Sequence, residues 1–326
     1  CAFFAAISGS SMATTASIGS VMYPEMVKRG YPKDYSAAVQ AIGGTLGVVI
    51  PPSIVFVIYG TITGVSISSL LMSGIIPGIF CGLLLALYCY VMAKKNNFPK
   101  GSDFKVPNVW ASFKRAFWAL MMPVIILGGI YAAIFTPTEA AVVSVFYGII
   151  VCMFIYKDID IKGLWKIAQN TAIVTANLMG LVASASVFAY LVTIYNIPVR
   201  ITEWFMSFCN TWVLFMIIIN IIMIIAGMFL DNGSIILILG PILAPLAVSY
   251  GIDPIQFGLV VVFILSMGQC TPPFGTCMFI ASGISGRPVL GVARALIGFL
   301  LVEIFCGLLF SFVPWFSLFI PEMLGM

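Results

Sequence analysis

The sequence contains no histidine in its 326 residues, and only 8% of its residues are charged. Without histidine, the chain cannot build a Ser-His-Asp or Cys-His catalytic group, an HExxH zinc site or a histidine pH switch. It also has no Walker-type loop for nucleotide phosphates. Soluble domains carry roughly 25% charged residues, whereas 62% of this chain is hydrophobic. The composition therefore predicts a protein whose solvent is a lipid bilayer.

The eight cysteines are scattered through apolar stretches without a CxxC pair. This pattern predicts buried thiols, and neither a disulfide framework nor a metal centre. The net charge of +4 is too small to indicate a nucleic-acid surface. An intramembrane hydrolase built on Ser10 would need a lysine or a second acid at membrane depth, and no lysine lies in a predicted span. We expect no enzyme activity, no cofactor and no nucleic-acid partner.

What the chain does have is a series of long apolar stretches between short charged clusters, a pattern typical of membrane-spanning helices. Its fold class is therefore predicted to be an all-α polytopic membrane protein. The spans are expected at 36–62, 70–93, 117–135, 139–156, 168–195, 254–281 and 289–312, with a further apolar run at 213–230.

An internal repeat organises these stretches. At an offset of 221, Gly or Pro residues pair without a gap at six positions, against about 0.4 expected by chance. The pairs are Gly19 with Gly240, Pro24 with Pro245, Gly30 with Gly251, Gly47 with Gly268, Pro51 with Pro272 and Pro52 with Pro273. Because Gly and Pro record backbone geometry, the chain carries two copies of one backbone plan.

Each copy contains a polar tip and a broken helix. The tips, 8–11 and 231–234, lie between apolar segments and predict re-entrant hairpins. The breaks, 43–53 and 266–276, each contain two adjacent prolines, which remove two helical donors. Unpaired carbonyls in hydrocarbon cost several kcal/mol each, unless a cation, a ligand or a neighbouring hydroxyl binds them.

Duplicated breaks beside duplicated tips indicate the binding site of a secondary transporter. Two other interpretations remain open at this point. The breaks can be simple kinks satisfied by neighbouring Ser and Thr, or the chain can be an ion channel or the permease of another transport system. Alternating exposure of the two tips to cysteine reagents favours a carrier, and simultaneous exposure favours a pore.

The charges predict how each copy is oriented. The loop at 28–33 carries three cations, whereas its partner at 249–253 carries none. Cytoplasmic loops are rich in Lys and Arg, so the first loop is expected inside, the second outside and the repeats inverted. Of the 15 Lys and Arg residues, only Arg200 and Arg294 then fall outside cytoplasmic loops.

The repeat also predicts how the chain is divided. Copy one lacks counterparts of the spans at 117–195, so we expect roughly 100 residues before Cys1. The segments expected are a first repeat core at 1–62, a helix and cytoplasmic linker at 63–115, scaffold helices at 116–203, a second repeat core at 204–282 and a last helix with the C-terminus at 283–326.

Three acids stand out. Glu139 follows Thr136 and Pro137 with the spacing of a capping box, and a role in ion or substrate handling is the alternative. Glu303 lies deep in the last span, where an acid is expensive, and is expected to have a partner inside the bundle or at a subunit interface. Asp231 is the only acid at a tip, where it either caps the returning helix or handles a cation or proton.

Four motifs resemble one known family. They are FFAAISGSS at 3–11, GVVIPPS at 47–53, FTPTEAA at 135–141 and GQCTPPFG at 268–275. All four look like the large membrane (M) subunit of tripartite ATP-independent periplasmic (TRAP) transporters. The resemblance implies an elevator-type, sodium-coupled symporter in the bacterial inner membrane. It also implies three partners: a small four-helix membrane subunit, a periplasmic substrate-binding protein and a small organic anion such as sialic acid or a C4-dicarboxylate.

The resemblance also implies site residues. The first sodium site would comprise Ser8, Gly9, Ser10, Ser11, Gly43, Thr45, Gly47 and Pro51. The second would comprise Asp231, Asn232, Gly233, Gly268, Gln269, Cys270 and Thr271. The substrate would lie between the tips, near Ser10, Ser11, Asn232, Thr271 and Pro272, where positive half-helix ends suit a carboxylate. The sequence differs from the family pattern at 232–233 and 269–270, where smaller or more apolar residues are expected.

Overall fold

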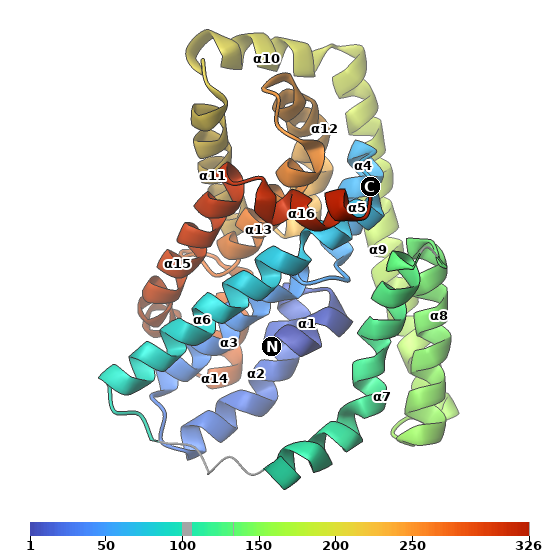
Figure 1. Cartoon of the computed structure of the whole chain (residues 1–326), viewed down its shortest axis with the longest axis vertical. Coiled ribbons are helices and arrows are strands. Elements are labelled where there is room, and N and C mark those ends of the chain that lie inside the picture. The colour runs from blue at the N-terminus through green and yellow to red at the C-terminus, as the bar shows by residue number, and fades with distance from the viewer. Residues whose placement is uncertain (100–105, 133, 326) are drawn as a thin grey trace. The chain divides into compact units, whose positions relative to one another are not determined.

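A computed structural model describes residues 1–99, 106–132 and 134–325, and every regular element among these residues is a helix. The chain divides into two compact units, Cys1–Gly101 with Ala189–Met326, and Ser102–Phe188. The first unit contains α1 (Ala2–Ser8), α2 (Ser11–Lys28), α3 (Lys33–Val49), α4 (Ile54–Thr63), α5 (Ile67–Ser73), α6 (Ile75–Lys95), α10 (Ile197–Phe208), α11 (Trp212–Phe229), α12 (Asn232–Ser249), α13 (Pro254–Gly268), α14 (Thr276–Ser285), α15 (Val289–Phe312) and α16 (Trp315–Met323) (Figure 1).

The second unit contains α7 (Val106–Tyr131), α8 (Pro137–Ile150) and the π-helical turn η1 (Val151–Ile155), followed by most of α9 (Ile161–Ile194). Tyrosine hydroxyls tie its helices together. Tyr156 donates to the carbonyl of Arg115, and Tyr147 donates to the carbonyl of Trp118, both at 2.7 Å. At the start of α8, Thr136 and Glu139 form the capping box that the sequence predicts.

The helices are long and apolar enough for a polytopic membrane protein. Seven spans qualify by length and composition among the described residues, or eight if the bent pair α3–α4 is one span. The prediction of an all-α, multi-pass fold is therefore confirmed. The last span begins and ends as predicted, and the predicted 70–93 span lies within one candidate span, Ile67–Lys95, in which Gly74 separates α5 from α6. The helices α11 and α12, on either side of the second tip, have 18 residues each, and each is long and apolar enough to cross a membrane by itself.

The two predicted helix breaks are present. The first separates α3 from α4 at 50–53, and the second separates α13 from α14 at 269–275. The peptide bond between the paired prolines is cis in both repeats. Both tips are short connections as well. Only Gly9 and Ser10 separate α1 from α2, and only Leu230 and Asp231 separate α11 from α12.

The core of the first unit lies around α3 and α13, which are buried along almost their whole length. In each repeat, the helix that follows the tip packs against a helix of the other repeat. The helix α2 packs against α14, where Tyr23 donates to the carbonyl of Ser285 at 3.2 Å, and the equivalent helix α12 packs against α4. The helices that follow the tips, α2 and α12, therefore each pack on the second half of the other repeat's broken helix.

Two helices, α10 and α16, were not predicted. Both are too short to span a membrane. A search for long apolar runs therefore passes over them. The hydroxyl of Tyr250 donates to the carbonyl of Cys209 at 2.8 Å, which fixes the end of α10 to the loop that follows α12.

Candidate ion and substrate site

The first tip is a sharp turn surrounded by hydroxyl groups. Gly9 ends α1 in the left-handed conformation, with φ of 61°, and Ser10 caps α2 by accepting a hydrogen bond from the Ala13 N–H. The hydroxyl oxygens of Ser8 and Thr14 lie 2.9 Å apart, and Ser8 Oγ also donates to the carbonyl of Ser10. Three hydroxyls therefore gather at the tip. Thr14 was not predicted as a site residue, although its spacing from Ser10 along one helix face could have indicated it.

This tip rests directly on the first break. The Ile54 N–H donates to the carbonyl of Gly9 at 3.3 Å. A Cβ atom on Gly9 would lie 2.8 Å from the carbonyl oxygen of Pro52, and a Cβ atom on Gly47 would lie 2.7 Å from that of Ser10. Side chains at either glycine would force the tip and the break apart. The structure thus brings the predicted tip residues and the proline break together.

The first break leaves backbone oxygens without helical donors. In a continuous helix the carbonyls of Gly47 and Val48 would accept from the N–H groups four residues later, but those residues are Pro51 and Pro52. Together with the tip hydroxyls, these oxygens form a set of neutral oxygen ligands, the type that a hard cation prefers.

Two predicted residues of the first site are directed elsewhere. The Thr45 hydroxyl oxygen lies 2.6 Å from the carbonyl oxygen of Ile42 and 2.5 Å from Glu303 Oε1. Its own carbonyl accepts a hydrogen bond from Ser266. A Cβ atom on Gly43 would meet the Cys1 thiol at 2.6 Å. These two positions serve helix packing on other faces of α3.

The second tip is held by a carboxylate. Asp231 caps α12 by accepting from the Ser234 N–H at 3.0 Å and from the Ser234 hydroxyl at 2.6 Å. The interpretation of Asp231 as a helix cap is therefore confirmed. Asn232 begins the helix and is only 2% exposed, yet neither polar atom of its amide has a hydrogen-bond partner among the described residues. A buried, unsatisfied amide at a tip is suited to a ligand.

The second break differs from the first because it closes its own hydrogen bonds. The carbonyls that Pro272 and Pro273 leave free are those of Gly268 and Gln269. The first accepts from the Thr271 N–H at 3.0 Å, and the second accepts from the Cys277 N–H at 3.0 Å. These carbonyls are satisfied by the backbone.

The first tip also touches the second break. The Ser11 hydroxyl donates to Gln269 Oε1, which the Cys277 thiol approaches at 3.6 Å. The neighbouring Cys270 thiol donates to the carbonyl of Ala41 in α3 at 3.2 Å. Residues predicted for two separate ion sites are therefore adjacent, and Ser11 and Gln269, 258 positions apart, join the repeats.

A cavity of about 540 Å³ opens beside these residues. Its lining residues flank the first tip, the second tip and the second break: Met12, Phe229, Phe274, Thr276, Phe279 and Ile280. The wall is largely aromatic, and the rings of Phe229 and Phe274 are 5.5 Å apart. Space for a small solute therefore adjoins the polar tips.

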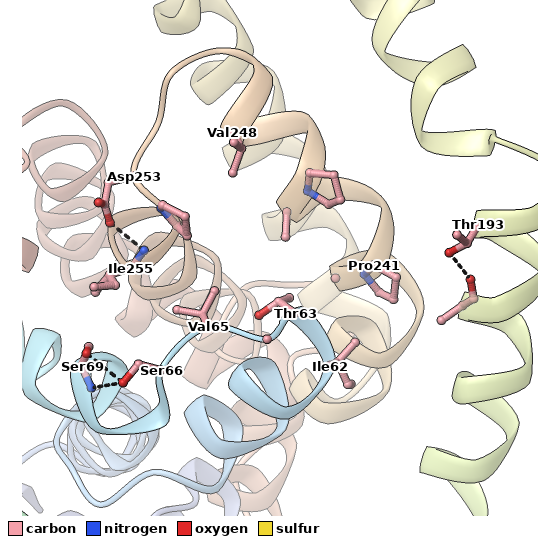
Figure 2. A pocket seen from close by; sticks show the side chains of 16 residues that line it. Ile62, Thr63, Val65, Ser66, Ser69, Thr193, Pro241, Val248, Asp253 and Ile255 are labelled. Atoms are coloured by element: carbon pink, nitrogen blue, oxygen red, sulfur yellow. Dashed lines mark hydrogen bonds between the residues drawn. The ribbon is translucent and has the colours of Figure 1, made fainter. Parts of the chain in front are cut away.

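Another cavity, of about 650 Å³, lies between the ends of α4, α5, α12 and α13 (Figure 2). Its polar groups already have local partners. The Ser66 hydroxyl accepts from the Ser69 N–H and Asp253 accepts from the Ile255 N–H, while the Thr193 hydroxyl donates to the carbonyl of Ala189. None of the predicted site residues lines this cavity. The tips and the breaks are the better candidate site.

Comparison with known proteins identifies the family to which the sequence is similar. The family model described as "Tripartite ATP-independent periplasmic transporter, DctM component" matches residues 1–316. The chain is 38% identical to the C4-dicarboxylate TRAP transporter large permease protein DctM of Rhodobacter capsulatus, over 100% of the chain and 77% of that relative. It is 34% identical to the ectoine TRAP transporter large permease protein TeaC of Halomonas elongata, over 99% of the chain and 76% of that relative.

It is also 32% identical to the sialic acid TRAP transporter large permease protein SiaM of Vibrio cholerae, over 98% of the chain and 75% of that relative. The family consists of transporter permeases, which confirms the prediction of transport rather than enzyme activity. The helices that can span a membrane, the two proline breaks and the matched family model lead to one conclusion: the chain belongs to the DctM family of TRAP transporter large permeases.

Proposed function

We propose that the protein takes up an organic acid anion by symport with sodium ions, which bind at the helix breaks. The contact between the first tip and the first break supports this proposal most strongly. Gly9, Ser10, Gly47 and Pro52 converge there, and the oxygens nearby belong to hydroxyls and carbonyls. Neutral oxygen ligands without a carboxylate suit a monovalent hard cation better than a divalent one.

At the first site, the ligands we propose are the hydroxyls of Ser8, Ser10 and Thr14 and the carbonyls of Gly47 and Val48, with Gly9, Ser11 and Pro51 adjoining them. Thr45 is not among the proposed ligands, because its hydroxyl and its carbonyl both have partners on other helices. Binding of an ion would stabilise the tip against the break.

At the second site we propose a weaker ion position. Its residues are Asp231, Asn232, Gly233, Gly268, Gln269, Cys270 and Thr271. The unsatisfied amide of Asn232 supports it. The Thr271 and Cys277 N–H groups already satisfy two carbonyls of the break, so an ion would have to compete with them.

The finer fold that we propose is a pair of inverted repeats with two re-entrant hairpins, which moves as an elevator. The repeat cores at 1–62 and 204–282 would carry the ions and the substrate across the membrane, and the helices at 116–203 would serve as the scaffold. The crossed packing of α2 on α14 and of α12 on α4 supports the repeat relationship, and the excess of cations at 28–33 supports the inversion.

The substrate would lie between the tips, near Ser10, Ser11, Asn232, Thr271 and Pro272, beside the cavity of about 540 Å³. The N-terminal ends of α2 and α12 would stabilise its carboxylate. Relatives are named for a C4-dicarboxylate, for ectoine and for sialic acid, so an organic acid is the class proposed. We also propose a periplasmic binding protein and a small membrane subunit as partners, in a bacterial inner membrane.

Uptake into proteoliposomes tests the coupling ion. Full-length protein reconstituted with its partners should accumulate substrate when sodium is outside, and should stop when potassium replaces sodium without a proton gradient. The Ser8→Ala/Thr14→Val variant should need more sodium for half-maximal uptake, whereas Ser144→Ala, whose hydroxyl donates only to the nearby carbonyl of Ala141, should behave like the wild type. Undiminished uptake in potassium would refute sodium coupling.

A further inference from the structure

Glu303 is the one glutamate buried in the described part of the chain, at 1% exposure. It lies within α15, which is long and apolar enough to span the membrane. One carboxyl oxygen, Oε1, lies 2.5 Å from the Thr45 hydroxyl. The other oxygen, Oε2, has no hydrogen-bond partner among the described residues. A carboxylate ion with a single hydrogen bond in hydrocarbon would cost several kcal/mol.

Within the described part of the chain, no cationic side chain contacts Glu303 to offset that cost. The titratable side chains that interact with Glu303 are thiols on the neighbouring elements: Cys81 of α6, Cys270 at the second break, Cys277 of α14 and Cys306 of α15. The helix α13, which also packs against α15, contains no titratable side chain. A sodium ion would be a poor counterion for Glu303. The neighbouring thiols offer soft sulfur ligands, which sodium does not prefer, and the nearest hydroxyl oxygen is that of Thr45.

The hydrogen atoms at Thr45 can be counted. Its hydroxyl has one hydrogen but lies within 2.6 Å of two oxygens, Glu303 Oε1 and the carbonyl oxygen of Ile42. A helical threonine commonly donates to the carbonyl three residues earlier, which here is that of Ile42. The carbonyl has no hydrogen to give. The contact with Glu303 then needs a second hydrogen, and only the carboxyl group can supply it.

We propose that Glu303 is a proton-binding site, in which the carboxyl group keeps its acid form and donates its proton to Thr45 Oγ1. The chain of donors then runs from Glu303 through Thr45 to Ile42, and each short contact contains one hydrogen. The bound proton joins the last long helix to the centre of α3. In the same place Ser266 of the other repeat holds the Thr45 carbonyl at 2.7 Å.

Infrared spectroscopy of the full-length protein at neutral pH tests the proton directly. The wild type should show the carbonyl absorption of a protonated carboxyl group, which Glu303→Gln removes and Thr45→Val shifts in frequency. A wild-type spectrum with carboxylate absorptions alone would overturn the proposal.

The pH dependence of thermal unfolding is an independent test. A folded state that holds a proton which the unfolded chain releases loses stability as the pH rises. The wild type should therefore lose this contribution as the pH rises from about 4.3, the ordinary pKa of a glutamate, towards neutral, and Glu303→Gln should have a pH slope without that loss. Glu303→Gln should also transport within about threefold of the wild type, because an amide can donate to Thr45 in the same way.

Two outcomes contradict the proposal. One is an identical pH slope in the wild type and in Glu303→Gln. The other is loss of uptake in a stably folded Glu303→Gln protein, since that result would mean that the negative charge itself is required. If Glu303→Gln does not fold, the spectra of the wild type and of Thr45→Val decide the question.

Discussion

Ser266 donates a hydrogen bond of 2.7 Å to the carbonyl of Thr45, the residue 221 positions before it. The same offset of 221 relates the two repeats, so these two residues occupy equivalent positions. Equivalent residues can touch only where the two copies meet each other. The contact therefore marks the centre of the repeat pair, in the middle of the most deeply buried helices, α3 and α13.

Removing this contact should weaken the joint between the repeats. Ser266→Ala is expected to lower the free energy of unfolding by about 1 kcal/mol, because the Thr45 carbonyl loses a buried partner. Sodium affinity should stay unchanged, since the first tip is not altered. Unfolding in detergent and the sodium dependence of uptake measure the two effects. A change in sodium affinity with unchanged stability would contradict this assignment.

Glycine at position 9 is expected to be required for ion binding. Gly9→Ala places a Cβ atom 2.8 Å from the Pro52 carbonyl oxygen and should raise the sodium concentration for half-maximal uptake. Alanine at a positive φ also costs about 1–2 kcal/mol by itself. Gly64 provides the matched control, because it has a φ of 75° and no atom within 4 Å of a Cβ. Equal uptake defects in Gly9→Ala and Gly64→Ala would show that backbone strain alone is responsible.

The bond from Ser11 to Gln269 should couple the first tip to the second break. In a double-mutant cycle with Ser11→Ala and Gln269→Met, we expect a coupling energy of about 0.6–1.7 kcal/mol, the range for buried side-chain bonds in membranes. The control is the pair of Asn220 and Ser311, which lies away from the tips. Its two side chains form a hydrogen bond of 2.8 Å. Breaking the control pair should lower stability without changing the sodium dependence of uptake. Additive effects at Ser11 and Gln269 would refute the coupling.

The ion pair of Arg287 with Asp34 should tie the start of α3 to the loop after α14. Two nitrogens of Arg287 contact the two carboxylate oxygens, at 2.5 and 3.2 Å. The neighbouring carboxylate raises the pKa of the Arg287 guanidinium, so the arginine keeps its charge throughout the usable pH range. Arg287→Gln should lower stability only slightly, because the pair is part-exposed, and the loss should shrink at high salt. Greater loss at high salt would contradict this expectation.

The sequence contained enough to predict the repeat, the two breaks and the all-helical, multi-pass fold. Those features depend on Gly47, Pro51 and their equivalents, whose backbone restrictions are local and can be recognised without a structure. The capping roles of Asp231 and Glu139 were local as well, since each side chain bonds to the backbone within three residues.

The contacts between repeats could not be predicted in the same way. Ser11 with Gln269 and Thr45 with Glu303 each join residues 258 positions apart, and their pairing depends on how helices pack. The resemblance to the TRAP family implied an ion site that included Thr45, which lies between two glycines of the break. Only the orientation of its side chain, towards α15, separates it from that site.

The unequal hydrogen bonding of the two breaks has an electrical consequence. In the proposed cycle, the ion at Gly47 and Val48 binds carbonyls that the prolines leave open, whereas the ion at Gly268 and Gln269 competes with backbone donors. One sodium ion neutralises a singly charged acid, so only the second makes the cycle move net charge, worth about 2.3 kcal/mol per 100 mV. Sensitivity to membrane potential therefore belongs to the weaker position. At falling sodium concentrations, that sensitivity should disappear before uptake itself does.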